Sequence, residues 1–143
     1  MIVPDANLLI FAYDSTSPHH AKARAWWEEL LSGDEPVGVP WVVVLAFTRL
    51  MTHPSVCAAP MTIRQVRKRV ALWFEQPHVR LVAPTQETLH LFFEFLEGAE
   101  LGGNLSTDAL IAAHAFENGA AIHSNDRDFD RFPRVRWTNP LGT

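Results

Sequence analysis

The sequence contains one cysteine, Cys57, so the chain cannot form a disulfide within itself. A reducing compartment suits such a chain, and we expect it to be cytoplasmic. The sequence also lacks a long apolar run, and its opening residues, Met1 to Asp5, carry no cluster of positive charge. We therefore predict neither a membrane span nor a signal peptide.

A surplus of positive charge is absent too. Lysine and arginine total 12 against 16 aspartates and glutamates, which gives a net charge of -4. A module that holds nucleic acid by charge alone is basic, so this class of protein is disfavoured. An enzyme that gathers carboxylates around a metal ion is compatible with an acidic chain.

The length of 143 residues is typical of one domain, and 48% of them are hydrophobic, which is enough to bury a core without disulfides. Short apolar stretches alternate with helical patterns, which predicts one domain over residues 1–143 with an α/β fold and a mainly parallel sheet. The predicted strands are Met1 to Pro4, Pro36 to Val39, Val79 to Val82, Ala120 to Ser124 and Val135 to Thr138.

Capping signals mark the predicted helices. Ser17-Pro18 predicts a helix start and Gly33 its end, Thr62 with Gln65 has the spacing of a capping box, and Thr107 can cap the last helix. We expect Gly102-Gly103-Asn104 to form a loop. The predicted helices are Ala6 to Tyr13, Ser17 to about Leu31, Trp41 to Met51, Thr62 to Glu75, Thr85 to about Gly98, and Asp108 to Asn118.

Four aspartates lie close to the predicted strands, either just after a strand or in the helix that precedes one. Asp5 follows the first strand, Asp126 and Asp128 follow the strand that ends at Ser124, and Asp108 opens the helix that leads into that strand. Ligands bind beyond the carboxyl ends of the strands in an open parallel sheet. If the two strands are neighbours, these acids converge on one edge.

Each acid also has a purely structural explanation. Asp5 can cap a turn or a helix. Asp108 lies in a first helical turn, where an acid interacts favourably with the helix dipole. Asp126, Asp128 and Asp130 can form a solvated turn. The local sequence leaves these alternatives open.

Gathered carboxylates repel one another and take up protons unless a cation is present. Mg²⁺ prefers oxygen ligands, activates water and neutralises charge that develops on a phosphodiester, so no nucleophilic side chain is needed. The sequence has no Ser or Cys nucleophile motif. Its seven histidines show neither a helical ligand pair nor Cys/His spacing, which disfavours zinc.

Three segments resemble those of PIN-domain ribonucleases, and more narrowly of VapC-type toxins. They are Val3 to Leu9, Thr107 to Ala113, and Ile122 to Phe129, and the ending from Phe132-Pro133 to Asn139-Pro140 is also similar to this family. The segments are short, but they occur in the family's order over nearly the whole chain. The resemblance implies a sandwich of helices around the parallel sheet.

The resemblance also implies an activity and a site. Such toxins are Mg²⁺-dependent endoribonucleases that cut structured RNA, often tRNA or rRNA. They are held in check by a VapB-type antitoxin, and they usually form homodimers. We expect Mn²⁺ to replace Mg²⁺. By this resemblance, Asp5, Asp108 and Asp126 are the catalytic metal ligands, and Asp128 is a candidate fourth ligand.

Polar and basic residues would complete that site. Asn7 and Ser124 would hydrogen-bond a ligand carboxylate or a metal-bound water. Arg49, Arg127 and Arg131 would contact RNA phosphates.

One residue departs from the family pattern. The family places a Glu in the helix that resembles Trp41 to Met51, and Phe47 stands where we expect it. Phe47 cannot bind a cation through oxygen, so one metal is better supported than two. It also motivates an alternative function, a non-catalytic PIN domain that binds RNA or an antitoxin.

A phosphatase or a phospho-acceptor domain also places an aspartate after the first strand. A haloacid-type phosphatase needs a second aspartate two residues later, where Asn7 stands, and a receiver domain needs a late lysine, whereas no lysine follows Lys68. Both classes are therefore disfavoured.

Overall fold

A single parallel sheet forms the centre of the protein. The computed structural model describes residues 1–100 and 103–142. Within them, five strands lie in the order β3-β2-β1-β4-β5, and every neighbouring pair is parallel. The strands are β1 Ile2–Pro4, β2 Val37–Pro40, β3 Val79–Val82, β4 Ala121–His123 and β5 Trp137–Thr138. The predicted α/β fold with a parallel sheet is confirmed.

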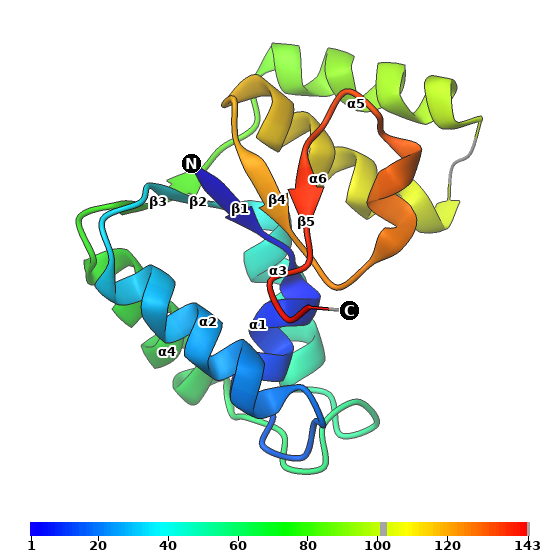
Figure 1. Ribbon diagram of the computed structural model, residues 1–143. Coiled ribbons are helices and arrows are strands. Elements are labelled where there is room, and N and C mark those ends of the chain that lie inside the picture. Colours follow the sequence, from blue (N-terminus) through cyan, green and yellow to red (C-terminus); the bar gives the residue numbers. More distant parts are fainter. Residues whose placement is uncertain (101–102, 143) are drawn as a thin grey trace.

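Helices cover the sheet on two sides. Figure 1 shows α5 and α6 together on one side of the molecule and α2 and α4 on the other, with the sheet between them. The helices are α1 Ala6–Tyr13, α2 His20–Ser32, α3 Trp41–Met51, α4 Ile63–Glu75, α5 Gln86–Ala99 and α6 Ser106–Glu117. Two 3-10 helices are also present among the described residues. η1 Gly103–Leu105 precedes α6, and η2 Arg127–Arg131 lies between β4 and β5. No helix among the described residues has the length and apolar character needed to cross a membrane.

Most predicted helix ends agree with the structure because their signals are local. Thr62 and Gln65 form the predicted capping box at the start of α4, and Gly33 is the C-terminal cap of α2. The predicted start of α2 at Ser17 is wrong, because the Ser17 hydroxyl oxygen accepts the backbone N–H of His19 and the helix begins at His20.

The segment before α6 also differs from the prediction. Gly103–Leu105 forms η1 instead of an open loop, whereas Gly102 lies outside the described residues. η1 leads directly into α6, so Leu105 occupies the cap position, and Thr107 already lies in the first turn. The predicted cap at Thr107 is therefore wrong.

Aromatic side chains join the helices on one side of the sheet. The Trp73 ring of α4 lies 5.4 Å from the Trp27 ring and 4.9 Å from the Phe47 ring, both measured between centroids. All three side chains are buried. Burial of rings of this size and their edge-to-face contacts stabilise the packing of α2, α3 and α4.

Gly38 sits where two neighbouring side chains leave no room for a methyl group. A Cβ at this position of β2 would lie 2.8 Å from Val82 Cγ2 and 3.0 Å from Met1 Sδ. We expect Gly38→Ala to lower the free energy of unfolding by about 1–3 kcal/mol through overpacking. Urea denaturation measures the change.

Gly98, in α5, is the matched control, because a Cβ there meets nothing within 4 Å. Gly98→Ala should be neutral or stabilise by up to about 1 kcal/mol, since alanine favours the helix. Equal effects of the two substitutions would refute the close packing at Gly38.

Candidate metal centre

The pairing of β1 with β4 brings the two ends of the sequence together. Pro4 lies opposite His123 in the parallel register, and the Asp5 backbone N–H donates to the His123 carbonyl oxygen at 2.9 Å. The residues that follow both strands therefore leave the sheet at the same edge, as the sequence predicts.

The Ser124 hydroxyl connects the two chain segments at this edge. It donates to Asp5 Oδ2 at 2.7 Å and accepts the backbone N–H of Asp126 at 2.9 Å. Asn7 Nδ2 lies 3.5 Å from the same oxygen. Ser124 is fully buried and Asp5 is nearly so. The serine thus fixes the orientation of Asp5 and the position of Asp126.

Three carboxylates gather beside Asp5 and Ser124. They belong to Asp108 of α6, Asp126 and Asp128, and one oxygen of each lies within 4.8 Å of the other two. Asp5 lies just outside this group, with its Oδ2 directed at Ser124. We call these four aspartates the acidic edge.

The turn after β4 sets the spacing of two of these acids. Asp126 Oδ1 accepts the backbone N–H of Asp128 at 2.9 Å and so caps η2. The structural explanation of Asp126 as part of a turn therefore holds, but the capping hydrogen bond uses only one of its two carboxylate oxygens. The cap itself brings Asp128 into the group.

The electrostatics of the acidic edge favour a cation. Burial and, to a smaller extent, the charges of Asp5, Asp126 and Asp128 together raise the pKa of Asp108 to about 7. Burial also raises the pKa of Asp5, although the hydrogen bond from Ser124 opposes this rise. A divalent ion removes the repulsion that both shifts reflect.

The donor atoms at the acidic edge fit a hard divalent metal. They are carboxylate oxygens, which Mg²⁺ and Mn²⁺ prefer to nitrogen or sulfur. Asn7 Oδ1 is buried and has no hydrogen-bond partner among the described residues. A metal-bound water is the kind of donor that would satisfy it.

The predicted RNA contacts fall into two groups. Arg49 of α3 lines a small hollow of about 180 Å³ together with Thr107, the neighbour of Asp108. Arg131 lies beside the acidic edge, with its Nε 3.8 Å from Asp128 Oδ1, and Arg127 is exposed at the start of η2. All three arginines therefore sit on the elements that carry or border the acids.

Phe47 does not face the acidic edge. Its side chain is fully buried, with its ring 5.5 Å from Tyr13 and 4.9 Å from Trp73 between centroids. Ala46 instead lines the hollow with Thr107. Phe47 therefore belongs to the core, whereas Ala46 is one of the α3 residues that lie beside the start of α6.

Helical spacing was the signal that could have identified Ala46. Val42, Ala46 and Arg49 share one face of α3 at intervals of four and three residues, and all three line the hollow. Phe47 lies about 100° further around the helix, on the face that packs into the core.

Comparison with known proteins identifies the fold family. The model of the PIN domain family matches residues 2–135. The chain belongs to the PIN domain family. Two proteins of Mycobacterium tuberculosis are similar over the full length of this PIN domain. Ribonuclease VapC33 is 36% identical over 141 residues, covering 99% of both chains, and ribonuclease VapC37 is 39% identical, covering 98% of this chain and 97% of its own. The predicted resemblance to VapC-type ribonucleases is confirmed.

Solved structures share the PIN fold. VapC20 of Mycobacterium tuberculosis, described as a sarcin-ricin loop cleaving toxin, has a TM-score of 0.70 at 18% identity and covers 95% of this chain and 99% of its own. VapBC2 of Rickettsia felis, bound to a DNA fragment from its promoter, has a TM-score of 0.69 at 19% identity, with 97% and 98% covered. These likenesses confirm the predicted sandwich of helices around the sheet.

The raised pKa of Asp108 predicts an unusual pH dependence of stability. The folded state holds a proton up to about pH 7, whereas the unfolded chain releases it near the ordinary value of 3.8. Folding is therefore favoured at low pH, and this contribution is lost as the pH rises through about 7. We expect the melting temperature of metal-free protein to fall, relative to Asp108→Asn, between about pH 4 and about pH 7 and to level off above that.

The Asp108→Asn variant is the reference because the lowered pKa values of His114 and His123 act in the opposite direction. Because both proteins contain these histidines, their effect cancels when the melting temperature of the variant is subtracted from that of the parent at each pH. Addition of Mg²⁺ or Mn²⁺ should raise the melting temperature of the parent at pH 8 more than that of the variant. A difference between parent and variant that stays constant with pH would contradict the assignment.

The positions of Phe47 and Ala46 predict opposite tolerance to the same new side chain. Phe47→Glu removes a buried ring and buries a carboxylate, so we expect a loss of at least about 3 kcal/mol in the free energy of unfolding. Ala46→Glu places its carboxylate in the hollow beside Thr107 and should cost less than about 1 kcal/mol. Urea denaturation of both variants tests this, and similar losses would show that the assigned faces of α3 are incorrect.

Proposed function

We propose that this PIN-domain protein is the endoribonuclease toxin of a VapBC-type toxin–antitoxin module. On this proposal it depends on Mg²⁺, with Mn²⁺ as a substitute, and it cuts structured RNA such as tRNA or rRNA. The observation that carries the proposal is the acidic edge, where three carboxylate oxygens converge beside Asp5. The full-length similarity to two named ribonucleases supports the same activity.

The residues of the acidic edge and Ser124 would have different roles in catalysis. Asp108, Asp126 and Asp128 would hold the metal, with Asp5 as the further ligand. The metal would supply a water of lowered pKa and would neutralise charge on the phosphodiester. Ser124 keeps Asp5 oriented by its hydrogen bond, so Asp5 remains an acceptor toward the metal or its water.

Positive charge beside the acidic edge would hold the substrate. Arg49, Arg127 and Arg131 are exposed, and their guanidinium groups can donate two parallel hydrogen bonds to a phosphate. Contacts of this kind position a nucleic acid without reading its sequence. The net charge of -4 is therefore compatible with RNA as the substrate, because the positive charge is local.

Exposed apolar residues of α3 support association with another chain. Trp41 and Leu45, four residues apart, are 56% and 64% exposed. Large exposed apolar side chains that adjoin one another mark interaction surfaces. We propose a homodimer and a VapB-type antitoxin as partners, in line with the VapBC complexes among the structural relatives.

The alternative of a non-catalytic PIN domain loses its motivation. It rested on Phe47, which packs into the core on the face of α3 away from the hollow at Thr107. The acids of the acidic edge are all present, and the full-length relatives carry the name ribonuclease.

Substitution of the acids tests the proposed activity. We expect the parent protein to cleave total RNA with Mg²⁺ or Mn²⁺ and to lose cleavage when the metal is chelated. Asp5→Asn and Asp126→Asn should each lower the cleavage rate at least about 100-fold, because each removes a charge that holds the metal. Gel analysis of a time course measures the rates.

Asp34→Asn is the matched control, since Asp34 is exposed in the segment between α2 and β2. It should cleave like the parent. RNA that stays intact with the parent protein in the presence of either metal would refute the enzymatic proposal.

A further inference from the structure

Positive charge gathers on one face of α4, away from the residues of the acidic edge. Arg64 lies three residues before Arg67 and four before Lys68, so the three side chains project from the same side of the helix. All three are exposed. α4 carries four basic residues and one acidic residue in a chain whose net charge is -4. We call Arg64, Arg67 and Lys68 the basic face of α4.

The charges of the basic face are not compensated. In residues 1–100 and 103–142, no carboxylate lies within ion-pair distance of any of the three side chains. The first turn of α4 has no acidic residue, so the helix dipole and the neighbouring like charges both disfavour this arrangement. The basic face therefore lowers the stability of the helix, and a bound anion would remove that effect.

An apolar groove of about 410 Å³ lies beside the basic face, between α3 and α4. Arg67 lines it, and its apolar walls come from Val44 of α3 and from Ile63, Val66 and Val70 of α4. Ile63 is 64% exposed. A site for a free phosphate needs no apolar wall of this kind. Charge and groove together fit a ligand that carries phosphates and flat apolar groups side by side.

α3 joins this groove to the acidic edge. Thr48 lines the groove, whereas Arg49 lines the hollow at Thr107, the neighbour of Asp108. Because Thr48 and Arg49 are consecutive, the two hollows lie on adjacent sides of one helix, which is about 10–12 Å wide. A flexible strand that leaves the acidic edge near Arg49 can therefore reach the basic face by crossing the C-terminal half of α3.

We propose that the basic face of α4 and the groove beside it bind a single-stranded segment of the RNA substrate. The three cationic side chains would contact backbone phosphates, and one unpaired base would lie in the groove. A duplex keeps its bases stacked inside and would leave the groove empty. An acidic peptide would also match the charge, but the route across α3 to the acidic edge favours RNA. The inference rests on the proposed RNA substrate and adds a contact outside the acidic edge.

Fluorescence anisotropy of the metal-free protein in EDTA measures binding of RNA without cleavage. The probe is a labelled hairpin with a single-stranded tail, and the matched probe is a blunt hairpin with the same number of phosphates. We expect the tailed hairpin to bind at least about fivefold more tightly, because only an unpaired base can fill the groove. Ile63→Ser should reduce this preference without changing the salt dependence of binding.

A triple variant tests the charge of the basic face. Binding that neutralises phosphates weakens as salt rises, by about 0.7 in the slope of log affinity against log salt for each phosphate on a single strand. We expect the slope to become less steep by about 2 when three contacts are lost. The variant is Arg64→Gln/Arg67→Gln/Lys68→Gln.

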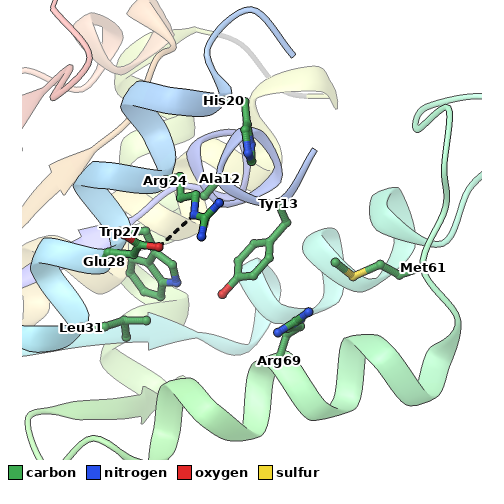
Figure 2. A pocket seen from close by; sticks show the side chains of 9 residues that line it. All are labelled: Ala12, Tyr13, His20, Arg24, Trp27, Glu28, Leu31, Met61 and Arg69. Carbon is green, nitrogen blue, oxygen red and sulfur yellow. Dashed lines mark hydrogen bonds and ion pairs between the residues drawn. The ribbon is translucent and has the colours of Figure 1, made fainter. Parts of the chain in front are cut away.

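A control variant removes the same amount of charge from other faces of the protein. Its three residues are exposed and lie outside the basic face and the groove. Figure 2 shows two of them, Arg24 and Arg69, at a separate cavity between α1, α2 and α4. We expect the control to keep the salt slope of the parent. It is Lys22→Gln/Arg24→Gln/Arg69→Gln.

Three outcomes would overturn the proposal. They are equal salt slopes of the two triple variants, equal binding of the tailed and blunt hairpins by the parent, and an unchanged RNA affinity of the basic-face variant together with a loss of its binding to phosphatidylserine vesicles. The last result would assign the face to a lipid surface, which offers phosphates without bases.

Cleavage of RNA with Mg²⁺ is measured separately on the parent. A parent that binds RNA through the basic face but does not cleave it would refute the nuclease proposal alone. A parent that cleaves RNA while the two triple variants bind alike would refute the contact on α4 alone.

Discussion

The hydrogen bonding between β1 and β4 holds the acidic edge together against the mutual repulsion of its carboxylates. The Asp5 backbone N–H donates to His123, and the Ser124 side chain returns a hydrogen bond to the Asp5 carboxylate. Both contacts are buried or nearly so, where they are stronger than they would be in water. The pKa of Asp108 is raised by its burial and, in addition, by repulsion from the other three acids, which is the electrostatic cost of keeping four acids at one edge.

The same edge shows how one residue can serve fold and chemistry together. Asp126 caps η2 through its Oδ1 and also contributes a carboxylate oxygen to the group with Asp108 and Asp128. Structural and functional explanations of such an acid are therefore not exclusive. The cap also determines that Asp128 arrives beside Asp126, so the fourth acid follows from turn geometry.

The parts of the fold that the sequence predicts well are those with local signals. The capping box of Thr62 and Gln65 lies within one turn of helix, and α3 lies between Pro40 and Pro54, which limit it on both sides. The convergence of Asp5 with Asp126 was conditional, because it depends on which strands become neighbours. The family resemblance supported the assumption that these two strands are neighbours, and the observed strand order places β1 beside β4.

The core position of Phe47 was difficult to predict for a related reason. α3 is apolar around most of its circumference, so composition alone does not reveal which residue faces α6. Only packing against Tyr13 and Trp73 distinguishes Phe47 from its neighbour Ala46.

The separation of Asp5 from Ser124 by 119 positions has a consequence for the order of events during synthesis. A nascent chain exposes Asp5 first, and Asp108, Asp126 and Asp128 follow only later in the sequence. Until β4 pairs with β1, Asp5 has neither its backbone partner nor its serine. The acidic edge therefore cannot assemble before Asp128 has been added to the chain, and any chemistry that depends on it begins only after that point.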